Sequence, residues 1–251
     1  IDYVVTKIPR WPFDKFKLAD RELGTQMKST GETMSIGRTF EESLMKAWRS
    51  IGQGKGYPEC LNWNKTRLEK SLKIPNDRRL IAIWTYLKNG KASRKTIQKV
   101  CKITDFHGFF VERIAELVKI ELKLEQCSKK ISDDLLTKAK TFGFGDKHIS
   151  HLTRIKQDKV RNQRKKLGII SSFLMVDTCA GEFEAKTPYF YSTYADQKTK
   201  VETGKSIVIL GSGPIRIGQG IEFDYSTVHG VQAARSAGYE AVVVNNNPET
   251  V

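Results

Sequence analysis

The feature that most constrains this chain is a glycine-rich stretch near its end, at residues 211–220. It follows four apolar residues, 207–210, whose pattern is typical of a buried parallel strand. A buried strand that opens into a glycine-rich turn often presents backbone N–H groups to an anionic ligand. An α/β domain is therefore expected to begin here. Because the chain ends at Val251 and such domains normally exceed about 100 residues, we expect a piece of a longer protein.

The residues after the glycines complete a β-loop-α-β pattern. A helix is expected over residues 227–238, ended by Gly238. Its apolar residues recur at intervals of three: Val228, Val231, Ala234 and Ala237. A second apolar strand is expected at residues 241–244.

Two phosphate-binding loops can be compared with these glycines. The dinucleotide pattern G-x-G-x-x-G needs glycine where Arg216 stands, and asparagines at 245–247 replace its acidic ribose ligand. Gly213 and Gly218 have the spacing of a Walker A loop, but residues 219–220, Gln-Gly, replace its lysine and hydroxyl residue. Both loops therefore lack required chemistry. The alternative to ligand binding is a structural role, in which the glycines only permit a tight turn and close packing.

The first segment, residues 1–51, is expected to contain two strands and a helix. The first strand spans residues 1–8 and ends at Pro9, which lacks a ladder donor. Three aromatic residues of the following loop are expected to be buried against a sheet: Trp11, Phe13 and Phe16. Residues 27–38 form a short strand region with turns on both sides, and it carries one carboxylate, Glu32.

A capping box predicts the helix of this segment. The Thr39 hydroxyl can accept from the Glu42 amide, while the Glu42 carboxylate reaches back to the cap. The helix then places four apolar residues on one packed face: Leu44, Ala47, Trp48 and Ile51.

The second segment, residues 52–203, is expected to be mainly helical. Helices are predicted at about 77–89, 109–124, 135–142 and 154–167, and strands at 173–176 and 189–191. Helices this short need mutual packing, so a compact helical domain follows. Since its sequence shows no triad, metal cluster or phosphate loop, a structural or assembly role is expected.

The chain is strongly basic, with 43 lysines and arginines against 28 acidic residues and a net charge of +15. Such an excess is compatible with nucleic-acid binding. The densest basic cluster, residues 154–166, is polar throughout and lacks interleaved aromatic residues on which bases could stack. A solvated helix face is the simpler interpretation, and no nucleic-acid partner is expected.

Cysteines, histidines and apolar runs suggest no metal site, disulfide framework or membrane span. Four cysteines are scattered without a C-x-x-C pair: Cys60, Cys101, Cys127 and Cys179. His148 and His151 lie three residues apart with only Asp146 nearby as an acidic partner. No apolar run approaches the roughly 20 residues that cross a bilayer. A reducing, cytoplasmic location is the expectation.

Longer strings carry a family resemblance. Residues 211–225, followed by 244–251, closely resemble the start of the second synthetase half of the carbamoyl-phosphate synthase large subunit. Residues 5–11 and 27–38 resemble the end of its first ATP-grasp half, and residues 176–184 and 191–194 the end of its central oligomerisation domain. The strings at the two ends of the chain match independently.

The resemblance implies three parts and a fold class. Residues 1–51 would end the carboxyphosphate half, 52–203 would form the helical oligomerisation domain, and 204–251 would open the carbamoyl-phosphate half. The fold would comprise α/β fragments that flank a mainly α-helical central domain. The C-terminal piece would be a truncated β-loop-α-β unit of a Rossmann-like pre-ATP-grasp domain.

The resemblance also implies a reaction. The family makes carbamoyl phosphate from bicarbonate, glutamine-derived ammonia and two ATP, so the parent would be an ATP-dependent ligase that uses Mg²⁺. The ligands for ATP and Mg²⁺ would precede Ile1 or follow Val251, and no catalytic, cofactor or metal ligand can be assigned to a residue here. We therefore expect the isolated chain to be inactive.

Four residues match positions that line the family's internal carbamate tunnel: Glu32, Gly220, Glu222 and Glu249. A polar lining could keep an unstable carbamate moving without trapping it. The alternative for each glutamate is a local partner, either backbone N–H groups or the side chains of Arg38 and Arg216.

The implied partners are a small glutamine amidotransferase subunit or domain, the remainder of the large subunit, and a second copy through the central domain. The parent's product would serve arginine synthesis, pyrimidine synthesis or both. Two other functions stay open from the residues alone, a basic helical nucleic-acid-binding protein and a stand-alone nucleotide-binding protein.

Overall fold

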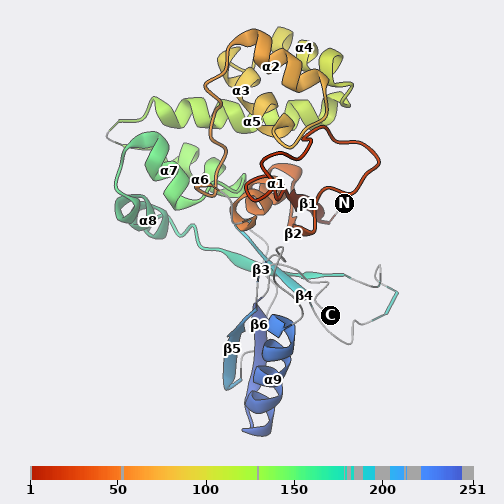
Figure 1. The fold of residues 1–251 in the computed structure, drawn as a ribbon. Helices are drawn as coiled ribbons and strands as arrows, with labels where there is room; N and C mark the ends of the chain where they lie inside the picture. Colours follow the sequence, from red (N-terminus) through yellow and green to blue (C-terminus); the bar gives the residue numbers. More distant parts are fainter. Residues whose placement is uncertain are drawn as a thin grey trace.

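The computed structural model describes residues 2–51, 54–128, 130–177, 179, 182–183, 189–195, 204–211, 213 and 222–244. A body of helices occupies the middle of the chain, and small α/β pieces stand at its two ends (Figure 1). The expected mixed fold with a mainly helical centre is confirmed at this level.

The N-terminal piece is a two-stranded antiparallel sheet of β1 (Val4–Arg10) and β2 (Gly31–Gly37). Strand β1 continues through Pro9 to Arg10, so the predicted end at Pro9 was wrong. Each strand of a two-stranded sheet is an edge strand, where the missing donor of proline is tolerated. In the next loop Phe13 is buried as predicted, but Phe16 is 53% exposed and that prediction was wrong.

Helix α1 (Phe40–Ser50) packs against both strands of this sheet. The Thr39 hydroxyl accepts from the Glu42 amide at 3.2 Å, which confirms the first half of the capping box. The Glu42 carboxylate reaches one residue further back than predicted and accepts from the Arg38 amide at 2.8 Å.

Seven helices form the body: α2 (Lys65–Lys73), α3 (Arg79–Asn89), α4 (Arg94–Thr104), α5 (Gly108–Glu125), α6 (Asp133–Thr141), α7 (Asp146–Thr153) and α8 (Gln157–Lys166). Helix α5 lies at the centre and contacts α1, α3, α4, α6 and α7. One apolar cluster fills the body, and its fully buried side chains include Trp84, Leu87, Leu117 and Leu124.

The sequence prediction missed three of these helices, α2, α4 and α7. Helix α2 buries only Leu68 and Leu72, so its apolar pattern is weak. The capping residues Asn64 and Ser93 could have revealed α2 and α4. The predicted helix at 154–167 begins later, at Gln157, because the preceding chain forms the separate helix α7.

A hairpin of β3 (Ser172–Val176) and β4 (Tyr189–Thr193) follows the body, close to both predicted strands. Its buried residues Leu174, Val176 and Tyr191 pack with Tyr3 and Ile36 of the N-terminal piece in a second, small core. The hairpin therefore joins the N-terminal sheet although the whole helical body separates the two in sequence.

The C-terminal piece contains β5 (Ser206–Leu210), α9 (Glu222–Ser236) and β6 (Glu240–Val244), with the two strands parallel. The predicted β-loop-α-β order is confirmed, but α9 begins at Glu222, before the predicted start at residue 227. Much of this piece is exposed, including Val208 at 60% and Leu210 at 79%. Parallel sheets are normally covered on both faces, so this one has room for further elements.

Candidate functional site

Glu32 lies on β2 opposite Pro9 of β1. Its carboxylate is 3.1 Å from the Nζ atom of Lys7, and both side chains are nearly half exposed. An ion pair this accessible contributes only about 0–1 kcal/mol to stability. The partner of Glu32 is thus a neighbouring lysine, not the Arg38 guanidinium considered from the sequence.

The other three predicted tunnel residues belong to the C-terminal piece. Glu222 is the first residue of α9 and is exposed, and its backbone carbonyl accepts from the Ser226 hydroxyl at 2.9 Å. Gly220 and Glu249 lie outside the described residues. Glu32 and Glu222 stand on separate α/β pieces, and their roles stay predictions.

A cavity of about 660 Å³ lies between β1, α1 and the start of α3. Its wall includes four aromatic residues: Trp11, Trp48, Tyr57 and Phe106. Lys7, the partner of Glu32, also lines it. The cavity therefore has a wall of both apolar and charged side chains, and Lys7 places it next to one predicted tunnel residue.

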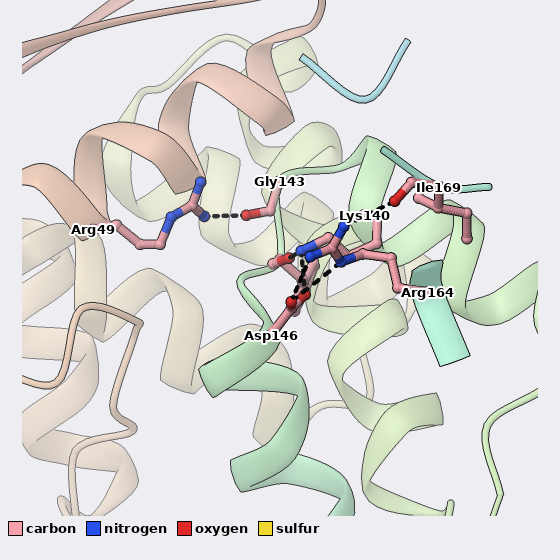
Figure 2. A network of polar contacts seen from close by, with 7 residues as sticks. Arg49, Lys140, Gly143, Asp146, Arg164 and Ile169 are labelled. Carbon is pink, nitrogen blue, oxygen red and sulfur yellow. Dashed lines mark hydrogen bonds and ion pairs between the residues drawn. The ribbon is translucent and has the colours of Figure 1, made fainter. Parts of the chain in front are cut away.

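A buried polar cluster joins three helices of the body to α1 (Figure 2). Lys140 of α6 donates to the Asp146 carboxylate at 2.7 Å and to the Phe144 carbonyl at 2.8 Å. Arg164 of α8 donates to the other oxygen of Asp146 at 3.1 Å, and Arg49 of α1 donates to the Gly143 carbonyl. Asp146 thus links two helices through opposite oxygens.

Burial shapes the ionisation of this cluster. It lowers the pKa of Lys140 to about 8, although the hydrogen bond to Asp146 acts in the opposite direction. Burial would also raise the pKa of Asp146, but the hydrogen bond and charge of Lys140, with those of Arg164, hold it below its usual value. Asp146 is therefore an ionised link at neutral pH.

The hairpin ends against this cluster. The ring of Tyr194, directly after β4, lies 4.6 Å from the Lys140 Nζ atom and 5.6 Å from the Arg164 guanidinium. These contacts could not be predicted from the sequence, because the partners lie on different elements. The sequence does indicate that Lys140 is buried, since it follows Leu136 by one helical turn and so falls on the buried face of α6.

His148 and His151, considered above as metal ligands, take part in aromatic stacking. The His148 ring lies between Tyr57, at a centroid distance of 4.5 Å, and Phe144, at 5.0 Å. His151 stacks on Tyr57 at 5.1 Å. In the described part of the chain, no three His, Cys, Asp or Glu side chains gather to hold a metal ion.

Among the helices of the described residues, none is both long enough and apolar enough to cross a bilayer.

The fold defines a class of protein, a helical body that joins two α/β pieces of one chain. Two family models match it. The model of the carbamoyl-phosphate synthetase large chain oligomerisation domain matches residues 32–168. The model of the carbamoyl phosphate synthase preATP-grasp domain matches residues 203–251. The oligomerisation-domain model thus covers β2, α1 and the whole helical body.

Curated relatives agree with these models. A carbamoyl phosphate synthase large chain from Methanothrix thermoacetophila is 46% identical over 259 residues. Those from Methanosarcina barkeri and Methanosarcina acetivorans are 46% and 45% identical. Each alignment covers 100% of this chain and 23% of the relative. The chain belongs to the carbamoyl-phosphate synthetase large chain family, and it spans about a quarter of the length of these relatives.

Proposed function

We propose that this chain is the junction region of the large chain of a glutamine-dependent carbamoyl-phosphate synthase, an ATP-dependent ligase. Residues 1–51 would end the first synthetase half, 52–203 would form the oligomerisation domain, and 204–251 would open a Rossmann-like domain of the second half. The observation that carries the proposal is the order of the two family matches in one chain.

The parent enzyme would form carbamoyl phosphate from bicarbonate, ammonia released from glutamine and two ATP. The family depends on ATP, and the residues that hold ATP and Mg²⁺ would lie elsewhere in the large chain. Carboxylates that could gather around a metal are lacking in the part of the chain described here. The proposal assigns no nucleotide or metal ligand to these residues, because the family resemblance implies that those ligands lie outside them.

This region would contribute to the passage of carbamate between the two synthetase halves. Glu32, Gly220, Glu222 and Glu249 are its proposed lining. The Lys7 partner of Glu32 and the adjacent 660 Å³ cavity support a polar passage near β1 and β2. A cation paired to the carboxylate would keep the wall close to neutral, so that carbamate is not held strongly.

The helical body and the C-terminal piece would supply assembly contacts. Partners would be the small amidotransferase subunit, the remainder of the large chain and a second copy of the helical body. The exposed β5–β6 sheet supports contact with the remainder of the large chain, because parallel strands normally have further strands beside them and helices on both faces. A cytoplasmic enzyme of arginine or pyrimidine synthesis is the corresponding cellular role.

The tunnel proposal can be tested in a full-length large chain that contains this region. We expect Glu222→Ala to lower the carbamoyl phosphate formed per ATP consumed, because carbamate that leaks to water decomposes after the first ATP is spent. The matched control is Asp224→Ala, two residues along the same first turn of α9. An unchanged ratio for Glu222→Ala would contradict a role for Glu222 in the passage.

The chain by itself is expected to turn over no ATP. Phosphate release from ATP, measured with the purified 251-residue chain and bicarbonate, checks this point. Reproducible turnover that Glu222→Ala abolishes would contradict it.

A further inference from the structure

Two side chains of α1 hold the end of the β3–β4 hairpin. The Glu42 carboxylate accepts from the Thr193 hydroxyl at 3.1 Å, and the Lys46 Nζ atom donates to the Ser192 carbonyl at 2.6 Å. Glu42 and Thr193 are each only 2% exposed. Residues 192 and 193 are thus fixed by positions one helical turn apart, across most of the length of the chain.

The same two side chains also hold β2 and the turn after it. The Glu42 oxygen that accepts from Thr193 accepts from the Arg38 amide at 2.8 Å. Lys46 donates to the Ile36 carbonyl as well. Each residue therefore bridges the N-terminal sheet to the hairpin. Hydrogen bonds to a buried carboxylate are strong, and removing one leaves a charge incompletely satisfied.

Apolar contacts and one more hydrogen bond support this bridge. The Tyr3 and Tyr191 rings lie 6.3 Å apart, and the Tyr3 hydroxyl donates to the Asp177 carbonyl at 3.3 Å. Figure 1 shows β1, β2 and α1 next to the hairpin, with the helical body to one side. These contacts involve both strands of the hairpin and the sheet, so the hairpin is fixed along its length.

We propose that Glu42 locks the β3–β4 hairpin onto α1 and β2, so that β1, β2, α1, β3 and β4 form one rigid platform. The helical body, α2 to α8, is then an insert that projects from this platform. Because the hairpin precedes the C-terminal piece in the chain, the platform links the two α/β pieces directly. A role of this platform in coupling two synthetase halves rests on the proposed function. The lock between Glu42 and the hairpin does not depend on that function.

Hydrogen–deuterium exchange of the whole 251-residue chain, read by mass spectrometry, tests the lock. Thr193→Val keeps the shape of the side chain and the Thr39 cap of α1 but removes the hydroxyl, which donates to Glu42 and accepts from the Ala195 amide. We expect amides of residues 172–176 and 189–193 to exchange about tenfold faster or more, with α3 and α5 unchanged. Glu42→Ala is expected to accelerate the same segments further.

Glu41 supplies a matched control. It lies beside Glu42 on α1 and is equally buried, but its carboxylate pairs with Arg113 of α5 at 3.3 Å. Glu41→Gln is expected to leave exchange in the hairpin unchanged. The lock is overturned if Thr193→Val leaves hairpin exchange unchanged, or if Glu41→Gln accelerates it equally.

If Glu42→Ala does not fold, Thr193→Val and Glu41→Gln decide the question. The measurement involves no ATP, carbamate or partner. A negative result would therefore remove the lock and leave the proposed function intact, whereas failure of the tunnel test would leave the lock intact.

Discussion

The helical body and the C-terminal piece differ in how completely they bury their apolar side chains. In the body, the seven helices pack around a shared core with α5 at its centre, and Leu117 and Trp84 have no exposed surface. In the C-terminal piece one helix, α9, packs on two parallel strands, and Ala234 is its one buried residue. The body can stabilise itself, while the C-terminal piece depends on further packing.

The largest expected contrast comes from truncating a leucine in each region. Leu117→Ala in α5 leaves a cavity in a closed core and should lower the free energy of unfolding by about 2–5 kcal/mol. Leu210→Ala in β5, where the side chain is 79% exposed, should change it by less than about 0.5 kcal/mol. Urea titrations of both variants measure the difference. Equal losses would mean that the C-terminal piece is as well packed as the body.

Glycines with positive φ give the next contrast. Gly143 has φ of 87°, and an added Cβ would lie 3.0 Å from the Glu42 carbonyl oxygen. Gly143→Ala should therefore cost about 2–4 kcal/mol, the sum of backbone strain and a clash with α1. Gly238, after α9, has φ of 80° and nothing within 4 Å of an added Cβ, so Gly238→Ala should cost only about 1 kcal/mol.

Thermal unfolding of the two glycine variants separates the two costs. If both variants lose the same stability, the contact between residue 143 and α1 contributes nothing beyond the strain. In that case the attachment of the body to α1 at this turn would be looser than the structure indicates.

The third contrast is a pH dependence confined to the body. Burial lowers the pKa of His148 to about 3, so between pH 3 and its unfolded value near 6.5 only the unfolded chain binds this proton. Stability is therefore lost as the pH falls through this range, by about 2 kcal/mol at pH 5. His148→Phe should remove this part of the acid sensitivity and keep the stack between Tyr57 and Phe144.

The matched substitution in the C-terminal piece is His229→Phe on the exposed surface of α9. It removes a histidine from the other region and serves as the control. Guanidinium titrations at pH 5 and pH 7 compare the three proteins. An unchanged slope in His148→Phe would show that another group carries the acid sensitivity.

Local signals in the sequence predicted much of the fold. The Thr39 cap, the helix end at residue 89 and the strand at 207–210 each depend on neighbouring residues, and each was found where expected. The weakly apolar helices α2 and α4 were missed, because their stability comes from packing against α3 and α5. Strand β1 continues beyond Pro9 because an edge strand tolerates a proline. The sequence does not show that β1 is an edge strand.

The candidate site divides in the same way. The family and the four proposed tunnel residues came from strings of neighbouring residues, and the family was confirmed by the matches over residues 32–168 and 203–251. The Lys7 partner of Glu32 could not be predicted, because it depends on the register between β1 and β2. Glu42 was recognised from the sequence only as a helix cap, without its contact to Thr193.

The sequence by itself determined the helices and strands with strong local patterns. It also determined the family to which the chain belongs. Both depend on patterns of neighbouring residues. The tertiary structure alone decided that α1 holds the hairpin through Glu42 and that Asp146 joins α6 to α8. These contacts join residues far apart in the chain. Their energies depend on burial and distance, and neither exists before the elements pack together.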